Sequence, residues 1–486
     1  MKLKALLADI EVLETNVNME LEVTGVAYDS RKVTPGSLFV AITGFATDGN
    51  RFIPMAMEKG AAAVVTAHKP QTDVPYILVA SDRKALALLG ANYYGRPARA
   101  MTMVGITGTN GKTSSTLLLK HVIETVLGAK VGLIGTMENC IGDEVVPTER
   151  TTPESFDLQG LFGRMRDAGC GYVVMEVSSH AIALDRVAGV HYDVAAFTNL
   201  TEDHLDFHET MENYCDAKAE LFARCGRAVF NCDDPWFARV SAKASCDFLT
   251  TSVEGKGSLR AKDLVLLSDG ISFTAVHGDE QVPVKLSIPG KFTVYNALTV
   301  LATAMQLGIS LADAAAALAT AQGVKGRVEV VPTPGKDYTI LIDYAHSPDG
   351  LENVLSSVKD YCRGRLIAVY GCGGDRDRTK RPIMGRIGAE LADIAIITSD
   401  NPRTEEPMAI IGDIVAGLPE TVENYTVIEN RIAAIHHAMD IAEKNDIIVL
   451  AGKGHETYQE ICGVKHHLDE REVVAQYLSE TRENNG

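Results

Sequence analysis

The chain has 486 residues, of which 46% are hydrophobic and 23% are charged. This composition is typical of a soluble globular protein, and the length corresponds to about three domains of ordinary size. The 46 basic and 64 acidic residues give a formal net charge of −18. That charge argues against a general nucleic-acid binder and against binding to an anionic membrane surface. Small anionic substrates are not excluded, because they need only a local cluster of cations.

Cysteine usage and the start of the chain indicate a compartment. The nine cysteines are scattered and include no C-x-x-C pair, which favours reduced thiols over a disulfide framework or a zinc site. The first residues, MKLKALLADIEVLE, carry acids too early for a secretory signal. No apolar run approaches the roughly 18 residues that span a bilayer. We therefore expect a cytoplasmic protein without membrane insertion and without a nucleic-acid partner.

Residues 1–98 are predicted to form a small α/β domain. Short apolar runs at 37–42, 63–66 and 76–79 indicate strands, and helical patterns cover 51–59 and 83–94. Asp29-Ser30-Arg31-Lys32 is a polar run ahead of Pro35-Gly36, and by itself it favours a solvated surface turn. Gly95-Arg96-Pro97 looks like a linker.

A glycine loop follows the next predicted strand, at 101–106. The loop contains Gly108, Gly111, Lys112 and Thr113, and a helical pattern covers 115–127. A strand, a glycine loop and a helix together point backbone N–H groups and a helix N-terminus at a phosphate. The strict phosphate-loop pattern wants glycine at 106, where this chain has Ile106, so the loop is a variant. We predict nucleotide binding here, with Lys112 on the terminal phosphates and the Thr113 hydroxyl on Mg²⁺.

Strand–helix alternation continues over 99–328 and predicts a mostly parallel sheet. The strand pattern at 172–177 carries Glu176 near its end. Such an acid is costly to bury unless it is paired or bound to metal, and in phosphate-loop enzymes it commonly helps to hold Mg²⁺. After a further strand pattern at 194–198, His204 and His208 have a spacing that suits zinc, but no H-E-x-x-H and no cysteine accompanies them, so zinc is not favoured.

Lys218 lies within an apolar helical stripe formed by Tyr214, Leu221, Phe222 and Cys225. Two interpretations stay open for it. The lysine could lay its stem on the core with its amine in water, or it could face a metal site. Further along, two alanine-rich helices are predicted within 297–321, the second capped by Ser310 with Asp313 three residues on. Residues 323–328 resemble a hinge.

Residues 329–486 are predicted to form a third α/β domain, with strands at 339–342, 366–370, 394–398 and 447–451. The run 371–376 resembles a dinucleotide loop, but Arg376 stands where its third glycine would be, which argues against NAD. Ligands collect at the carboxyl ends of the strands in such sheets. Asp343, Arg376, 400–403 and 452–456 each follow a strand pattern directly, so we expect them to line one edge.

Nine segments together resemble the Mur ligase family, the ATP-dependent amide-forming enzymes of peptidoglycan synthesis. They are GTNGKT (108–113), MEVSSHA (175–181), TNLTEDHLDFH (198–208), YCDAKAELF (214–222), YNAL (295–298), GRVE (326–329), DYAHSPDG (343–350), GCGGDRDRTKRP (371–382) and AGKGHETYQ (451–459). The resemblance implies an α/β fold of three domains: a UDP-binding domain over 1–98, a central P-loop ATPase-like, mostly parallel sheet over 99–328, and a C-terminal Rossmann-like, amino-acid-binding ligase domain over 329–486.

The resemblance also implies the reaction. ATP would phosphorylate the D-glutamyl carboxylate of UDP-N-acetylmuramoyl-L-alanyl-D-glutamate, and an amine would attack the acyl phosphate. Asp400-Asn401-Pro402-Arg403 matches the family motif that accompanies meso-diaminopimelate. An arginine can bind the far carboxylate of that amino acid through two parallel hydrogen bonds, and it would repel the ammonium of lysine. A solvated turn is the alternative for this motif.

Family positions that match residues of this chain give the expected site. The catalytic residues would be Lys112, Glu176, His204 and Lys218. Two Mg²⁺ ions would bind near Thr113 and Glu176 and near His204 and Lys218, the latter as a carbamate (N6-carboxylysine). Positions for ATP are Gly108, Thr109, Asn110, Gly111, Lys112, Thr113, Asn296, Arg327 and Asp343. Positions for the UDP substrate are Ser30, Thr151, Thr152, Ser178 and Arg186. Positions for diaminopimelate are Arg376, Asp400, Asn401, Pro402, Arg403, Gly452 and Glu456.

Other members and functions define the alternatives. A lysine-adding enzyme and a ligase for D-alanyl-D-alanine are close rivals, and Arg403 argues against both. Folylpolyglutamate synthase shares the ATP core but lacks a UDP-binding first domain. A non-catalytic nucleotide-binding homologue would not need Lys112, Glu176, His204 and Lys218 together. We expect a monomer that binds only small-molecule substrates.

Overall fold

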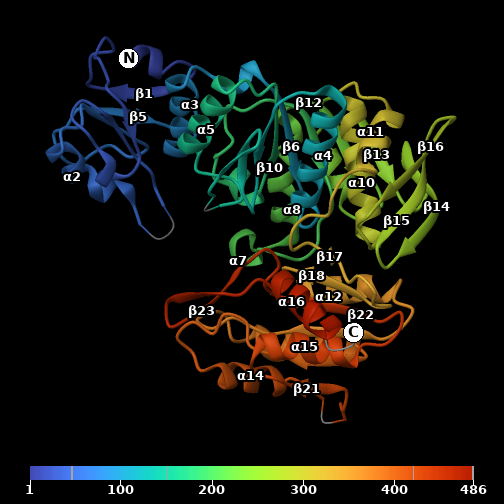
Figure 1. Cartoon of the computed structure of the whole chain (residues 1–486). Helices are drawn as coiled ribbons and strands as arrows, with labels where there is room; N and C mark the ends of the chain where they lie inside the picture. Colours follow the sequence, from blue (N-terminus) through green and yellow to red (C-terminus); the bar gives the residue numbers. More distant parts are fainter. Residues whose placement is uncertain (45–46, 149, 420, 484–486) are drawn as a thin grey trace. The chain divides into compact units, whose positions relative to one another are not determined.

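The computed structural model describes residues 1–44, 47–148, 150–419 and 421–483. The chain forms two compact units (Figure 1). The first contains Met1–Arg260 and Asn296–Ala317, and the second contains Ala261–Tyr295 and Leu318–Gly486. Within the described residues, no helix combines the length and the apolar character that a membrane crossing requires. The domain boundaries predicted after residues 98 and 328 stay predictions.

The N-terminal part of the first unit is a five-stranded sheet in the order β1-β5-β4-β3-β2, parallel except for β1 on β5. Helices cover both faces: α1 and α3 pack on Leu38, Val40 and Ala63, and α2 packs on Phe39 and Val64. The elements are α1 Leu3–Leu6, β1 Val12–Thr15, β2 Val26–Ala27, η1 Ser30–Lys32, β3 Leu38–Ala41, η2 Gly49–Phe52, α2 Ile53–Glu58, β4 Ala63–Thr66, β5 Tyr76–Val79, α3 Asp82–Tyr93 and η3 Pro97–Ala100.

A second sheet continues in the first unit, where its strands include the run β13-β12-β11-β6-β10-β7-β8-β9. Its strands from β13 to β7 are parallel, and β8 and β9 add an antiparallel tail. The elements are β6 Thr102–Thr107, α4 Lys112–Leu127, β7 Val131–Ile134, β8 Asn139–Ile141, β9 Glu144–Val146, α5 Ser155–Asp167, β10 Tyr172–Glu176, α6 Ser179–Ala183, β11 Tyr192–Phe197, α7 Leu205–His208, α8 Met211–Ala219, η4 Phe222–Arg224, β12 Cys225–Asn231, α9 Phe237–Ser241 and β13 Phe248–Ser252.

The register of this sheet sets where the site lies. Glu176 at the end of β10 is opposite Ile106 of β6, and Phe197 at the end of β11 is opposite Thr107. The loops that leave these three strands therefore start at one edge. Because β10 and β11 flank β6 on opposite sides, the chain also switches direction across the sheet here, which is where ligands bind in open α/β sheets.

Two helices differ from the sequence-based prediction. α4 begins at Lys112 instead of residue 115, because Gly111 adopts a left-handed conformation (φ 82°) and turns the loop directly into the helix. The helix of Lys218 ends at Ala219 and does not continue to Cys225. The chain leaves it to enter β12, and the intervening short turn keeps Leu221 and Phe222 buried.

The alanine-rich segment forms α10 Lys291–Gln306 and α11 Leu311–Leu318. The predicted cap is confirmed: Asp313 N donates to Ser310 Oγ at 3.1 Å, and Ser310 Oγ donates to Asp313 Oδ2 at 2.6 Å. Before them, β14 Leu259–Leu267 is followed by an antiparallel hairpin of β15 Gly270–His277 and β16 Glu280–Leu286.

The C-terminal part of the second unit is a six-stranded sheet in the order β17-β18-β22-β19-β20-β21, with β17 antiparallel to the rest. Residues of α12 to α14 pack on one face, and residues of α15 and α16 pack on the other. The elements are β17 Glu329–Val331, β18 Thr339–Asp343, α12 Pro348–Lys359, β19 Leu366–Tyr370, α13 Lys380–Leu391, β20 Ile394–Ile397, α14 Pro407–Val415, β21 Tyr425–Val427, α15 Arg431–Ile441, β22 Ile447–Ala451, β23 Tyr458–Ile461, β24 Val464–His467 and α16 Glu470–Glu483.

A buried ion pair fastens two of these helices to the sheet. Arg431, at the start of α15, places its Nε 2.7 Å from Glu470 Oε1 at the start of α16, and both residues are 1% exposed. The same guanidinium donates to the carbonyl oxygen of Ala451 at the end of β22, at 2.9 Å. Removing one partner of such a pair leaves the other charge buried and uncompensated.

We therefore expect Arg431→Met to lower the free energy of unfolding of this region by about 3–5 kcal/mol. Arg431→Met combined with Glu470→Gln should recover part of that loss, because no unpaired charge is left. Urea denaturation followed by far-UV circular dichroism measures both. Equal midpoints for the single variant and the unmodified protein would contradict this account.

Candidate active site

The phosphate loop is built so that only glycine fits at its two turning points. Gly108 (φ 151°) and Gly111 (φ 82°) follow β6 and precede α4. A Cβ at Gly108 would lie 1.9 Å from Thr198 Oγ1, and one at Gly111 would lie 2.3 Å from Asn296 Oδ1. Side chains of β11's following loop and of α10 therefore occupy the space that any larger residue would need.

The loop is held from the neighbouring strand end. Thr198 Oγ1 donates to Asn110 O at 2.6 Å, and Asn110 N donates to Asn199 Oδ1 at 2.9 Å. Thr109 N donates to the backbone oxygen of Asn199 at 2.9 Å. Thr198 and Asn199 begin the segment TNLTEDHLDFH and were not among the predicted site residues. Their place directly after a predicted strand was the signal that could have found them.

Two lysine amines meet at one backbone carbonyl. Lys112 Nζ and Lys218 Nζ each donate to Gly108 O at 2.9 Å. Lys218 is 1% exposed and lies 4.5 Å above the centroid of the Tyr214 ring. Burial, and after it the positive charge of Lys112, lower the pKa of Lys218 well below its usual range. The amine of Lys218 therefore does not reach water, which removes the first of its two interpretations.

Glu176 is 1% exposed at the end of β10. Its carboxylate accepts hydrogen bonds from Thr136 N at 2.9 Å and from Thr136 Oγ1 at 3.0 Å. These contacts compensate a buried acid without an ion pair. Glu176 is opposite Ile106 in the sheet, so its carboxylate is one strand away from the phosphate loop.

The residues expected at the UDP substrate continue along this edge. Thr151 Oγ1 lies 3.0 Å from Thr136 Oγ1, and Thr152 Oγ1 donates to Glu176 O at 2.8 Å. Ser178 N donates to Thr152 Oγ1 at 3.2 Å, and Arg186 Nη1 donates to Thr152 O at 3.2 Å. Ser30, by contrast, begins the short helix η1, in the part of the chain that forms the N-terminal sheet. Its hydroxyl contacts Met55 Sδ.

The rings of His180, His204 and His208 form an aromatic group. The ring of His180 lies 4.8 Å from that of His204 and 5.5 Å from that of His208. His204 has a left-handed backbone (φ 54°) and an exposed ring, whereas His208 is buried and its Nε2 lies 2.9 Å from Ser179 Oγ. Across the residues that the structure describes, no three His, Cys, Asp or Glu side chains gather as a metal cluster.

In the second unit, Asp343 ends β18 beside the predicted hinge. Its carboxylate accepts from Val328 N and from Ala345 N, each at 2.8 Å. Burial raises the pKa of Asp343, and the nearby Arg327 opposes that rise. The Arg327 guanidinium lies 5.3 Å over the Tyr344 ring. Arg327 and Asp343, both expected at ATP, therefore lie close to each other.

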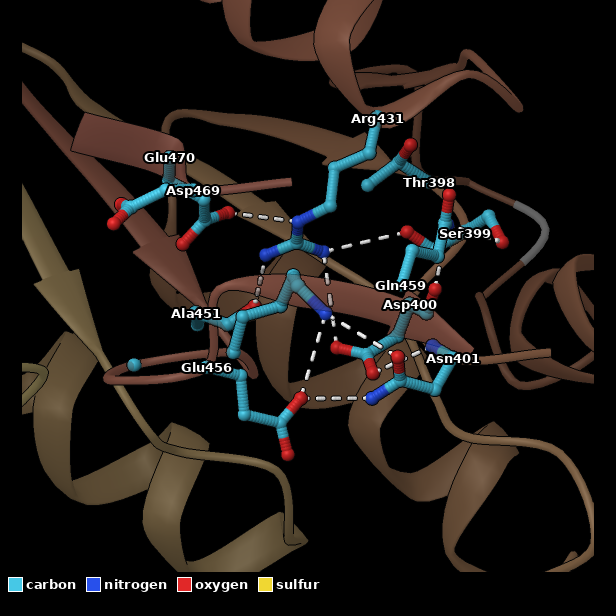
Figure 2. Close-up of polar contacts among 12 residues, drawn as sticks. Thr398, Ser399, Asp400, Asn401, Arg431, Ala451, Glu456, Gln459, Asp469 and Glu470 are labelled. Carbon is cyan, nitrogen blue, oxygen red and sulfur yellow. Dashed lines mark hydrogen bonds and ion pairs between the residues drawn. The ribbon is translucent and has the colours of Figure 1, made fainter. Parts of the chain in front are cut away.

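The Asp-Asn-Pro-Arg motif follows β20 and faces the segment after β22 (Figure 2). Asn401 Nδ2 donates to Glu456 Oε2 at 2.8 Å, so two residues expected at the amino acid contact each other. Gly452 (φ 118°) allows close approach, since a Cβ there would lie 2.6 Å from Asp400 Oδ2. Within the described part of the chain, Asp400 Oδ2 is buried without a hydrogen-bond partner, and it lies 3.9 Å from Arg431 Nη1.

Arg403 is oriented by its surroundings. Its backbone is left-handed (φ 51°) and hydrogen-bonds to the β23–β24 hairpin: Arg403 N donates to Glu460 O at 3.0 Å, and Cys462 N donates to Arg403 O at 2.7 Å. Its Nη1 donates to Gly374 O at 2.7 Å, and its Nε lies 3.4 Å from Glu460 Oε2. Arg376 is exposed on the loop before α13. The hairpin was missed from the sequence because its residues are mostly exposed and lack an apolar alternation.

The chain matches known protein families and relatives along most of its length. Residues 22–94, 106–304 and 326–454 match the family descriptions "Mur ligase family, catalytic domain", "Mur ligase middle domain" and "Mur ligase, glutamate ligase domain". The chain is 47% identical, over 99% of its length and 100% of the relative's, to a Clostridium botulinum protein named UDP-N-acetylmuramoyl-L-alanyl-D-glutamate–2,6-diaminopimelate ligase. A Clostridium tetani protein of the same name is 46% identical over the same shares of both chains. This chain belongs to the Mur ligase family.

Solved structures agree with this membership. A structure carrying the same ligase name has a TM-score of 0.75 at 30% identity and covers 99% of both chains. A ligase from Thermotoga maritima in complex with ADP shares the fold, with a TM-score of 0.60 at 20% identity over 95% of this chain and 98% of that one. The predicted three-domain α/β fold is confirmed, and so is the prediction that the chain is a Mur ligase enzyme.

The buried His208 of this Mur ligase gives the protein a pH-dependent stability. Burial, and after it the neighbouring His180 and Lys218, lower the pKa of His208 from 6.5 to about 4. Between these values the unfolded chain binds a proton that the folded chain does not, so stability falls as the pH is lowered from about 6.5 to about 4. In His208→Asn, the difference in bound protons between the unfolded and the folded chain should fall by up to one over this pH range. Urea denaturation at several pH values measures it, with the exposed His191→Asn as control. An unchanged slope in His208→Asn would contradict the assignment.

Proposed function

We propose that this chain is the ATP-dependent ligase that adds meso-2,6-diaminopimelate to the D-glutamyl carboxylate of UDP-N-acetylmuramoyl-L-alanyl-D-glutamate, in peptidoglycan precursor synthesis. The observation that carries this function is full-length similarity, at 47% and 46% identity, to two relatives with that name. Phosphate release that depends on both the UDP-dipeptide and diaminopimelate tests it. Release with lysine or D-alanyl-D-alanine in place of diaminopimelate would favour the rival members.

The phosphate loop supplies the cations that the chemistry needs. A triphosphate and a carboxylate must approach each other, and phosphoryl transfer relies mainly on positioning and on charge stabilisation. Lys112 lies at the first position of α4, where backbone N–H groups and the helix dipole also favour an anion. Its amine donates to Gly108 O and Thr109 O at 2.9 and 2.8 Å. We expect it to exchange these carbonyls for phosphate oxygens when ATP binds.

The oxygen donors of Glu176 and Thr113 suit a hard cation such as Mg²⁺. Glu176 is buried, and among the described residues Thr136 is the one that donates hydrogen bonds to its carboxylate. Thr113 is the second residue of α4. Mg²⁺ is usually bound by one or two protein oxygens together with waters and phosphates, so a three-residue cluster is not required. When bound, Mg²⁺ would supply charge neutralisation at the phosphate oxygens.

Lys218 suits carbamate formation. A carbamate forms when a neutral amine adds to carbon dioxide and loses a proton, and burial lowers the pKa of Lys218 well below its usual range. The product is an anionic oxygen ligand on a rigid helix, beside Lys112 and within the same group of side chains as His204 and Tyr214. We propose that Lys218 as N6-carboxylysine, together with His204, holds the second Mg²⁺.

The amino acid would bind in the second unit. Gly374 O and Glu460 contact Nη1 and Nε of Arg403 and orient its guanidinium, which we propose forms a bidentate bond to the far carboxylate of diaminopimelate. Glu456 and Asp400 offer carboxylate oxygens to an ammonium group. The amine that attacks the acyl phosphate loses a proton as the C–N bond forms, and phosphate then leaves with the electron pair of the broken C–O bond. The expected monomeric state and cytoplasmic location remain predictions.

Lys218→Ala should remove most of the activity, because the proposed carbamate ligand is lost. A small carboxylate such as formate should partly restore it by supplying an oxygen ligand in the space that the side chain leaves. Phosphate release measures both effects. Lys243→Ala, which removes an exposed lysine paired with Glu220, is the control. Full activity of Lys218→Ala without formate would end the carbamate proposal.

Arg403→Ala should weaken the use of diaminopimelate by about 100-fold or more in kcat/KM, because one bidentate charge contact is lost. The KM for ATP should change little. Steady-state kinetics with each substrate varied in turn measures both, with the exposed Arg363→Ala as control. An unchanged KM for diaminopimelate would reject the assignment of Arg403.

A further inference from the structure

Lys453 is a lysine with no exposed surface, in the segment that follows β22. A buried ammonium is costly unless polar groups surround it. Its Nζ lies 3.3 Å from Asn401 Oδ1 and 3.4 Å from Glu456 Oε2, and 5.6 Å from the centroid of the Tyr458 ring. The first two partners are residues already proposed to bind the incoming amino acid, whereas Lys453 itself has no role in that proposal.

These contacts close a small ring of polar groups. Asn401 Nδ2 donates to the same Glu456 oxygen that Lys453 approaches, at 2.8 Å. Asn401 Oδ1 accepts from Lys453 and also from Glu460 N, at 2.9 Å. The Asn401 amide therefore has three partners and the Glu456 carboxylate has two, and Lys453 is a partner of both. Its removal would leave Glu456, at the rim of the sheet edge, held by Asn401 alone among these groups.

The second buried cation of this region behaves differently. Arg431 has its own buried counter-ion, Glu470, at 2.7 Å (Figure 2). Among the described residues, Lys453 forms its ion pair with Glu456. Lys453 is therefore coupled to a residue of the proposed binding site, while Arg431 is coupled to the packing of two helices.

The charges around the motif indicate what the site accepts. The carboxylates of Asp400, Glu456 and Glu470 face two cations, Lys453 and Arg431, within the contacts described above. One negative charge is left over, and Asp400 Oδ2 is buried without a hydrogen-bond partner. One ammonium group of the ligand would balance that charge.

We propose that Lys453 is a positioning residue, which sets Glu456 and Asn401 in the orientation that receives an ammonium group of the incoming amino acid. This inference rests on the proposed function. Lys453 acts through Glu456 and takes no part in ATP binding, so its loss should appear in the KM for the amino acid and should leave the KM for ATP unchanged.

Lys453→Met tests this role, since methionine keeps an unbranched apolar stem and removes the ammonium. We expect the KM for diaminopimelate to rise at least 10-fold, with kcat and the KM for ATP within about threefold of the unmodified protein. Lys465→Ala is the matched control, because Lys465 is exposed and lies 4.0 Å over the same Tyr458 ring. A lower KM in Lys453→Met would show that Lys453 competes with the substrate for Glu456, and an unchanged KM would show that it positions nothing; either result overturns the proposal.

A double-mutant cycle with Glu456→Gln separates positioning from a general structural role. If Lys453 acts through Glu456, adding Lys453→Met to Glu456→Gln should change the KM for diaminopimelate by less than threefold. A further 10-fold rise would overturn the proposal. The double variant carries no unpaired charge from this pair, so the comparison of Glu456→Gln with the double variant also decides the question if Lys453→Met alone does not fold.

The two proposals fail in different ways. If the unmodified chain releases no phosphate in response to diaminopimelate, the proposed function fails. If the unmodified chain is active with diaminopimelate and the cycle is additive, the function stands and only the role of Lys453 fails.

Discussion

The carbonyl oxygen of Gly108 accepts hydrogen bonds from two lysine amines, and the organisation of the first unit depends on that meeting point. Both lysines come from helices, Lys112 from α4 and Lys218 from α8, which follow different strands of the same sheet. Two amines so close together, one of them buried, cannot both carry a proton cheaply. The protein thus holds one fixed cation at the loop and one amine whose charge is suppressed, and a carbamate on that amine would turn repulsion into attraction.

Glycine makes this meeting possible. At Gly108 and Gly111 the loop passes so close to Thr198 and Asn296 that a methyl group would overlap them. The loop therefore presents backbone N–H groups and the start of α4 to a phosphate, while the neighbouring strand end holds the loop from behind. Glu176, Thr152 and Arg186 continue the same edge through hydrogen bonds. This mostly parallel sheet thereby aligns the phosphate loop with Thr151, Thr152, Ser178 and Arg186, four of the five residues expected at the UDP substrate.

In the second unit, two buried cations are paired with acidic side chains. There Arg431 and Lys453 are buried beside the carboxylates of Asp400, Glu456 and Glu470 and the Asn401 amide, and Glu456 is the partly exposed carboxylate of the three. The left-handed backbone of Arg403 is secured by the β23–β24 hairpin, and its guanidinium is oriented by Gly374 O and Glu460. In the proposed site, an amino acid with a carboxylate at each end and two ammonium groups would have both cationic and anionic partners.

Several features could be predicted from the sequence because they depend on neighbours along the chain. The strands at 63–66, 76–79, 366–370 and 447–451 were predicted with the bounds that the structure has, since buried parallel strands are continuous apolar runs. The Ser310–Asp313 cap and the family itself also followed from local residues. The tertiary structure alone decided that the Lys218 amine bonds to a carbonyl 110 positions away, that Lys453 joins Asn401 to Glu456, and that a hairpin holds Arg403. Such contacts join residues remote in sequence, and the burial that changes their charge exists only once the sheets have formed.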